Sequence, residues 1–263
     1  ENYSTGTKVR WKFDPSDPNS ISNDTILAIS MDLTGILWIG TPSGLNRFDP
    51  KLEQFTRFRN DPSDGSSIGN NSITVIFTDE EYIWLGTLAG LSRMNRKTER
   101  FSLVQANEVI LQVSSILEAK KQELWIGSFG AIHKLNKETG ETKGYPVGNG
   151  INQVYKDSYG SIWLATQNGI YKYNEEEDRF VLWSNYPMIS IIEDPKKNLW
   201  VRSISQLFKI NEHRDNIIQY SSDQVVRIRN LKSLHAGGFL ANNGNLYLGD
   251  ENDYFLFNPD SLL

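Results

Sequence analysis

The sequence predicts an all-β fold, a β-propeller of four-stranded blades, with six blades favoured and seven as the alternative. Three observations predict it: a short phrase recurs along the chain, the segments around it have strand-and-turn patterning, and the strand that carries it is apolar on both faces. A sheet that is apolar on both faces must be packed between two other sheets, and a ring of such sheets is a propeller.

The recurring phrase is LWIGT at 37–41, and it returns in five later copies that diverge toward the C-terminus. Periods of about 40 to 47 residues suit either paired helices or a four-stranded blade. No sustained stretch has apolar residues at helical spacing, whereas Ile, Val, Trp, Tyr, Phe and Thr form short runs between Gly, Asn, Asp and Pro, so the blade is predicted. The aromatic residues of the copies, at spacings of 46, 41, 38, 37 and 47, are Trp38, Trp84, Trp125, Trp163, Trp200 and Tyr247.

The first complete copy predicts four strands, at about 25–31, 37–41, 44–49 and 54–60. An Asp precedes the second strand in four copies, and Ala119 replaces it in the third. A short Asp side chain accepts hydrogen bonds from backbone N–H groups just ahead of it, and glycine tolerates positive φ. These acids are therefore predicted to form turns rather than to catalyse a reaction. They are Asp32, Asp79, Asp157 and Asp194.

The second strand explains why both faces are apolar. Side chains alternate along a strand, so Trp38 and Gly40 share one face, and the Leu and Ile beside them share the other. Gly40 leaves room beside the indole for side chains of the adjacent sheet. The tryptophans at this position are therefore predicted to be core residues, each contributing about 3 kcal/mol or more.

The two ends of the chain complement each other. Residues 9–13 resemble 56–60, so the chain begins with a fourth strand, and it ends with a third strand near 254–258. The N-terminal strand is expected to close the ring by pairing there, because this removes an exposed sheet edge. Residues 1–263 are thus expected to form a single propeller domain, and the first residues read like the interior of a longer, multi-domain protein.

Composition argues against several classes of function. The 263 residues carry a net charge of -5 with scattered lysines and arginines, which argues against a nucleic-acid partner. The chain has no cysteine, so thiolate catalysis and cysteine metal sites are excluded. No apolar run approaches the length of about 18 residues that a membrane span needs, and no signal peptide begins the chain. No cofactor or metal is expected, since the acidic run at 250–253 lacks the spacing of a known calcium loop.

An enzyme would need converging acid–base groups, and the three histidines lie in different copies of the repeat. His133 is expected at a strand position that touches solvent, and His213 in a polar turn. His235 takes an isoleucine position of the first strand in the last copy, near the expected central channel. No catalytic residue is therefore predicted.

A ligand or partner is expected at the loops that join strands two and three and at the loops between blades, which share one face of a propeller. Arg202 stands where the repeat has glycine, and Phe129 where a small polar residue is usual. Sugars favour aromatic faces with bidentate hydrogen-bonding groups, and Arg reaches acidic groups. The alternative is that diverged repeats simply tolerate substitution. The candidate binding residues are Phe129, Gln167, Asn168, Tyr186, Arg202, His235 and Asp250.

The pattern I-x-x-I-x-x-D-x-x-G-x-LWIGT-x-x-GL-x-R-F-D, which stands at 26–49, resembles the two-component regulator propeller repeat. The segments FDPSDPNSISNDTI and FNPDSLL are also typical of that family. The resemblance implies a periplasmic sensor region of a membrane-anchored hybrid two-component system, which would bind a glycan, oligosaccharide or other small ligand. It also implies neighbouring propeller and β-sandwich domains and a kinase elsewhere in the full protein. A homodimer is a further candidate partner, which the interaction-platform hypothesis below would require. The repeat residues are structural, so no binding residue carries over.

Three hypotheses for function follow. The first is a non-catalytic sensor module of that kind. The second is a propeller lyase or hydrolase resembling streptogramin lyase, and the third is a platform for protein interaction or dimerisation. Because propellers host many functions, the fold by itself does not choose among them.

Overall fold

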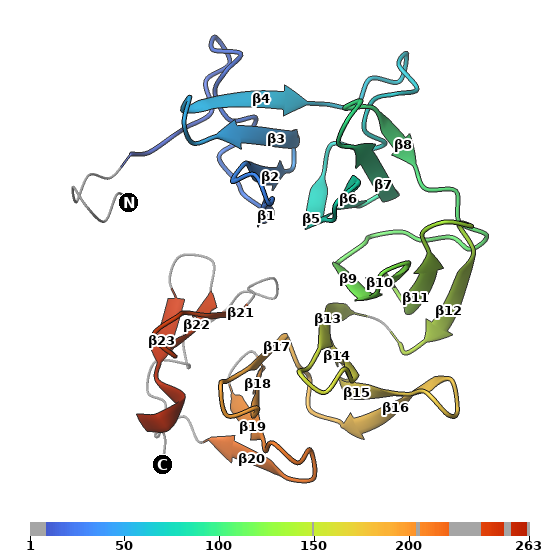
Figure 1. The fold of residues 1–263 in the computed structure, drawn as a ribbon, viewed down its shortest axis with the longest axis vertical. Coiled ribbons are helices and arrows are strands. Elements are labelled where there is room, and N and C mark those ends of the chain that lie inside the picture. The colour runs from blue at the N-terminus through green and yellow to red at the C-terminus, as the bar shows by residue number, and fades with distance from the viewer. Residues whose placement is uncertain (1–8, 149, 204–205, 221–237, 250–253, 262–263) are drawn as a thin grey trace. The chain divides into compact units, whose positions relative to one another are not determined.

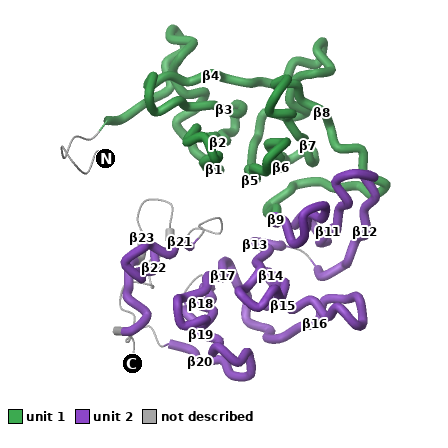
Figure 2. The backbone as a smooth tube through the Cα atoms, viewed as in Figure 1, with its two compact units in different colours: residues 1–116 green, residues 117–263 purple. Residues whose placement is uncertain are grey.

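The chain folds into six antiparallel sheets in which the strands follow sequence order (Figure 1). The computed structural model describes residues 9–148, 150–203, 206–220, 238–249 and 254–261. Within this part, five sheets have four strands and the last has three. The contacts divide the chain into two compact units, residues 1–116 and 117–263 (Figure 2). No helix in the described part is long and apolar enough to span a membrane.

Unit 1 contains the first two sheets. The predicted second and third strands of the first copy, 37–41 and 44–49, coincide with the observed strands, and the outer two are shorter than predicted. The strands of unit 1 are β1 (Ala28–Met31), β2 (Leu37–Thr41), β3 (Gly44–Asp49), β4 (Gln54–Phe58), β5 (Ile73–Thr78), β6 (Tyr82–Thr87), β7 (Gly90–Asn95) and β8 (Phe101–Leu103).

Unit 2 contains the later sheets, and the boundary between the units falls inside β9. The strands are β9 (Ser115–Lys120), β10 (Glu123–Gly127), β11 (Ala131–Asn136), β12 (Thr142–Pro146), β13 (Ile151–Lys156), β14 (Ile162–Thr166), β15 (Gly169–Asn174), β16 (Arg179–Ser184), β17 (Ser190–Glu193), β18 (Leu199–Arg202), β19 (Leu207–Ile210), β20 (Ile217–Tyr220), β21 (Gly238–Leu240), β22 (Leu246–Gly249) and β23 (Tyr254–Phe257). The last sheet has no fourth strand in the described part, as the sequence predicts.

Residues 9–13 differ from the prediction. They are described without regular secondary structure, so the expected strand is not formed there, and ring closure by this segment stays a prediction. The physical reason lies within unit 1, where Trp11 finds packing without a strand partner. Its ring meets Phe48 edge-on at a centroid distance of 4.8 Å and Phe55 at 6.2 Å.

The second strand of the first five repeats is buried on both faces, as predicted, whereas Tyr247 in the last repeat is only partly buried. In unit 1, Trp84 and the two residues flanking it are fully buried, and β14 is buried along its whole length in unit 2. The glycine two residues after the tryptophan provides space for a side chain of its own sheet and for one from the segment that leads into the next sheet. A Cβ placed on Gly86 would lie 2.4 Å from Val75 and 2.6 Å from Val113. Glycine is therefore required there by close packing rather than by its backbone conformation.

The recurring acids form the predicted turns and have a second role that the sequence does not reveal. Asp32 accepts hydrogen bonds from the backbone N–H groups of Thr34 and Ile36, at 2.9 and 3.2 Å. Its other carboxylate oxygen accepts the indole N–H of Trp38 at 3.0 Å. The same bond is repeated in three other sheets, and it satisfies a polar atom that burial would otherwise leave unpaired. The other pairs are Asp79–Trp84, Asp157–Trp163 and Asp194–Trp200, at 2.8, 2.9 and 2.8 Å.

Two of these acids also bind an arginine from the following sheet of the same unit. Arg96 donates to Asp32 at 3.0 Å in unit 1. Arg214 donates to Asp157 at 3.1 Å in unit 2, and also to Glu193 at 2.7 Å. Each ion pair ties the turn of one blade to the next blade, and burial of the side chains makes such a pair costly to break.

The third copy lacks the acid and packs its tryptophan differently. Trp125 lies among the rings of Tyr145, Tyr173 and Phe180, at centroid distances of 4.9 to 5.4 Å. The hydroxyls of both tyrosines donate to Asp178, which also pairs with Lys143. An aromatic cluster between neighbouring blades thus takes the place of the acid–indole bond.

This cluster predicts a pH-dependent stability. The hydrogen bonds from Lys143 and from the two tyrosine hydroxyls hold the pKa of Asp178 below its usual value, while burial and the bond to Asp178 raise the pKa of Tyr173 to about 12. A lowered carboxyl pKa contributes stability above the unfolded pKa of about 4, and this contribution is lost as the pH falls through the folded pKa. Asp178→Asn should therefore destabilise the chain at neutral pH, with a difference from the parent that shrinks below about pH 4.

Urea unfolding of both proteins between neutral and acidic pH measures this difference. Glu175→Gln, which removes an exposed acid paired with Lys120, is the control and should show little effect at any pH. A difference between Asp178→Asn and the parent that is the same at both ends of the pH range would contradict the linkage.

Candidate functional site

The turns between strands two and three and the loops between blades lie at the same end of each sheet, as predicted. Backbone hydrogen bonds join them directly. In unit 1, the N–H of Gln112 donates to Leu88 at 3.1 Å, and in unit 2 the N–H of Met188 donates to Thr166 at 2.8 Å. We call these turns and loops the loop face. The Asp-initiated turns lie at the other end of the same strands, so a ligand site on the loop face would not disturb them.

The loop face of unit 1 contains a groove of about 310 Å³. Its walls come from the segment before β1, the β2–β3 turn, the residue that follows β4 and the loop before β5. The lining residues are Phe13, Ser22, Asn23, Pro42, Ser43, Arg59 and Asn71. The sequence analysis singled out none of these residues as binding candidates, because they lie in four separate segments that only the folded unit brings together. The positive charge of Arg59, directly after the fourth strand, is the signal that could have pointed to them.

In unit 2, three of the candidate residues lie in adjoining loops. Gln167 and Asn168 form the β14–β15 turn, and Tyr186 lies in the loop before β17. The backbone N–H of Gln167 donates to Gly150 at 3.0 Å. A Cβ on Gly169 would lie 3.1 Å from the Cα of Asn185, so this turn abuts the loop that carries Tyr186.

Two exposed aromatic rings stand on this face of unit 2. Phe129 is 62% exposed in the β10–β11 turn. Tyr186 is 42% exposed and lies beside Phe208, with ring centroids 4.9 Å apart and planes inclined by 34°. Tyr186 is therefore held in place by a buried neighbour and still offers ring surface to a ligand. No contact between Phe129 and the other candidates is described.

Arg202 is different from the other candidates, because its side chain is fully buried at the end of β18. Its backbone carbonyl accepts the N–H of Ile189 at 2.6 Å, so it belongs to the sheet and not to a projecting loop. Its burial shows that the Arg202 side chain does not project from the loop face, and binding of a ligand or partner by this residue stays a prediction. His235 and Asp250 lie outside the described residues.

His133 also differs from its prediction. It is 5% exposed rather than in contact with solvent, and its Nε2 lies 2.9 Å from the hydroxyl of Ser128. The reason is that the third strand, like the second, is covered on both faces at this point. The described part of the chain holds no group of three or more His, Cys, Asp or Glu side chains that could bind a metal ion.

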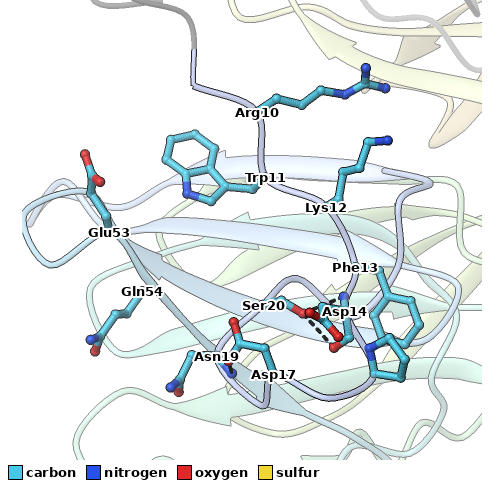
Figure 3. Close-up of a pocket in the computed structure, with 11 residues that line it drawn as sticks. Arg10, Trp11, Lys12, Phe13, Asp14, Asp17, Asn19, Ser20, Glu53 and Gln54 are labelled. Atoms are coloured by element: carbon cyan, nitrogen blue, oxygen red, sulfur yellow. Dashed lines mark hydrogen bonds between the residues drawn. The ribbon is translucent and has the colours of Figure 1, made fainter.

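A second groove, of about 670 Å³, lies beside the N-terminal segment of unit 1 (Figure 3). Trp11, Lys12 and Phe13 line it, together with Glu53 of the β3–β4 turn and Gln54, the first residue of β4. The internal repeat aligns Trp11 with Phe58, which contacts Phe101 of the next sheet at 5.4 Å. Trp11 makes the corresponding contact with Phe55, so we interpret this groove as a consequence of blade packing rather than as a ligand site.

Comparisons with known proteins agree with the fold. The family described as two component regulator propeller matches residues 146–168, which run from the end of β12 through β14. No curated protein matches the chain. The extracellular domain of a protein assigned as a hybrid two-component system in Bacteroides thetaiotaomicron has a TM-score of 0.75 at 21% identity, covering 91% of this chain and 34% of that one.

Two further structures are similar. The extracellular domain of a protein assigned as a one-component system in B. thetaiotaomicron has a TM-score of 0.51 at 21% identity, covering 94% of this chain and 37% of that one. PorZ, a surface component of the type-IX secretion system of Porphyromonas gingivalis, has a TM-score of 0.66 at 16% identity, covering 89% and 38%. The chain thus spans little more than a third of the length of these structures.

The six sheets and their likeness to solved structures define the chain as a β-propeller with six blades, which confirms the predicted fold class. Within that class, residues 146–168, which contain the fourth copy of the recurring phrase, match the two-component regulator propeller family, and the resemblance to that family is confirmed.

Proposed function

We propose that this chain is a non-catalytic, ligand-sensing propeller from the extracytoplasmic region of a hybrid two-component system. The observation that carries the proposal is the match to the extracellular domain of such a system over 91% of the chain, together with the family match at residues 146–168. The ligand class that we propose is an oligosaccharide or another small molecule. The whole receptor would be anchored in the membrane and would include neighbouring propeller and β-sandwich domains, with a homodimer as the signalling form.

The loop face supports this assignment, because its turns differ from copy to copy, while four of the turns at the opposite end share the Asp that binds the repeat tryptophan. A scaffold with constant packing and variable loops is the usual arrangement of a binding protein. The exposed rings of Phe129 and Tyr186 and the amides of Gln167 and Asn168 give unit 2 the aromatic and hydrogen-bonding groups that a sugar requires.

The test uses the full-length receptor that contains this chain, with a transcriptional reporter of its response. Phe129→Ala and Tyr186→Ala should each weaken the response to the activating ligand by about tenfold or more, which corresponds to about 1.4 kcal/mol of binding free energy. Tyr159→Ala is the matched control, because Tyr159 is a 54% exposed aromatic residue at the Asp-initiated turn of the same unit. It should leave the response unchanged.

A response that is lost in Tyr159→Ala and kept in both loop-face variants would show that the wrong face was chosen. A parent receptor that assembles normally but binds no ligand would favour the interaction platform. Turnover of a polysaccharide or lactone by the purified chain would favour the lyase or hydrolase.

A further inference from the structure

The groove on the loop face of unit 1 has an unusual balance of charge. Of its seven lining residues, Arg59 is the only charged one, and no acidic side chain lines the groove. We propose that this groove binds a ring-bearing organic anion, with a carboxylate or sulfate on Arg59 and the ring against Phe13 and Pro42. The proposal rests on the geometry of unit 1 alone, so it stands whatever ligand the receptor senses in unit 2.

Arg59 is held in position but is not used by its neighbours. A Cβ on Gly44 would lie 3.2 Å from the Cγ of Arg59. The aliphatic part of the arginine side chain therefore packs closely against the backbone at Gly44. The nearby Arg57 binds three backbone carbonyls of residues 14–20, and Arg96 binds Asp32. Among the described residues, by contrast, the guanidinium of Arg59 has no hydrogen bond or ion pair. It can therefore offer its planar fork of N–H donors to a carboxylate or sulfate.

The neutral groups of the groove also favour an anion. The side-chain oxygen of Asn71 accepts the backbone N–H of Asn60 at 2.8 Å, and that of Asn23 accepts the N–H of Thr25 at 2.8 Å. Both amide oxygens are thus engaged within the protein. The amide N–H groups of Asn71 remain as donors for a ligand. The hydroxyl of Ser43 is also a donor, because its oxygen already accepts a hydrogen bond from Asn23. A lining of donors around one cation suits a single negative charge.

The apolar wall is fixed before any ligand arrives. The backbone N–H of Phe13 donates to Asp24 at 2.7 Å, and the guanidinium of Arg57 lies 5.4 Å from the centre of the Phe13 ring. Phe13 remains 39% exposed. A volume of about 310 Å³ is at the small end of the range for ligand pockets, so the expected occupant is one ring with one anionic group.

Isothermal titration of the 263-residue chain with four probes tests the proposal. D-glucuronate and benzoate carry a ring and a carboxylate, D-glucose is the neutral counterpart of glucuronate, and acetate has the charge without the ring. At least one ring-bearing anion should bind with a dissociation constant of about 1 mM or tighter, and at least tenfold more tightly than glucose and acetate. Binding should weaken as the salt concentration rises.

Arg59→Gln should weaken that binding at least tenfold. Lys12→Gln removes a neighbouring positive charge that does not line the groove, and it should have little effect on the affinity. Arg59→Lys keeps the charge without the planar fork and should fall between the parent and Arg59→Gln. Binding by neither ring-bearing anion, equal affinity for acetate, or an affinity that Arg59→Gln leaves unchanged in a folded protein would each overturn the proposal.

Discussion

Replacing Asp157 by alanine is expected to cost unit 2 about 3 kcal/mol or more of unfolding free energy. Asp157 is 3% exposed, and its carboxylate accepts hydrogen bonds from the indole N–H of Trp163 at 2.9 Å and from the guanidinium of Arg214 at 3.1 Å. It also accepts the backbone N–H groups that shape its turn. The substitution would leave a buried indole N–H unpaired and remove half of the ion pairing of a buried arginine, and both effects destabilise.

Urea unfolding followed by tryptophan fluorescence measures this cost. Lys120→Ala is the control, because Lys120 and Glu175 form an exposed ion pair at 3.1 Å that should contribute less than about 1 kcal/mol. Asp32→Ala should reproduce the large effect in unit 1, where Trp38 and Arg96 are the partners. If Asp157→Ala unfolds at the same urea concentration as Lys120→Ala, the acid is only a turn former, as the sequence alone suggested.

Introducing valine at Gly86 is expected to destabilise unit 1 by about 3 kcal/mol, at the upper end of overpacking costs. The first side-chain carbon would already lie 2.4 Å from Val75 of β5 and 2.6 Å from Val113 in the segment before β9. Because these two neighbours belong to different segments, no single movement can relieve the overlap. Gly86→Ala should show a smaller effect of the same sign.

Thermal unfolding of the glycine variants tests this packing. Gly65→Ala is the matched control, because a Cβ at Gly65 meets nothing within 4 Å and its backbone conformation is open to any residue. It should be neutral or slightly stabilising, since alanine restricts the unfolded chain. A Gly86→Val protein as stable as Gly65→Ala would mean that the neighbouring sheet does not approach the strand as closely as the structure shows.

Much of the fold could be predicted because its signals are local. β2 and β3 coincide with the predicted ranges, since two-residue alternation and the turn between them are both encoded within a few positions. The face that carries the loops was also predictable, because antiparallel strands alternate in direction. The candidate residues Gln167, Asn168 and Tyr186 do lie in adjoining loops on that face.

The errors occurred where burial depends on neighbours in other strands. His133 has a polar side chain, and its strand pattern gave no reason to expect that a serine hydroxyl would satisfy it in the interior. Arg202 shows the same limit, because its place at a glycine position of the repeat did not reveal whether its side chain would be buried, and only the packed sheet does. At residues 9–13 the strand pattern is present, but a strand also needs a partner.

By itself, the sequence determined the class of fold, the positions of the inner strands, the turn acids and the family of the repeat, because each depends on periodicity or on turn chemistry within one copy. Only the tertiary structure decided which residues bind one another across copies. Arg214 meets Asp157 over 57 residues of sequence, and the groove around Arg59 draws its walls from four separate segments. Such contacts carry no local signal, since they arise when sheets pack and bring distant side chains to the same edge.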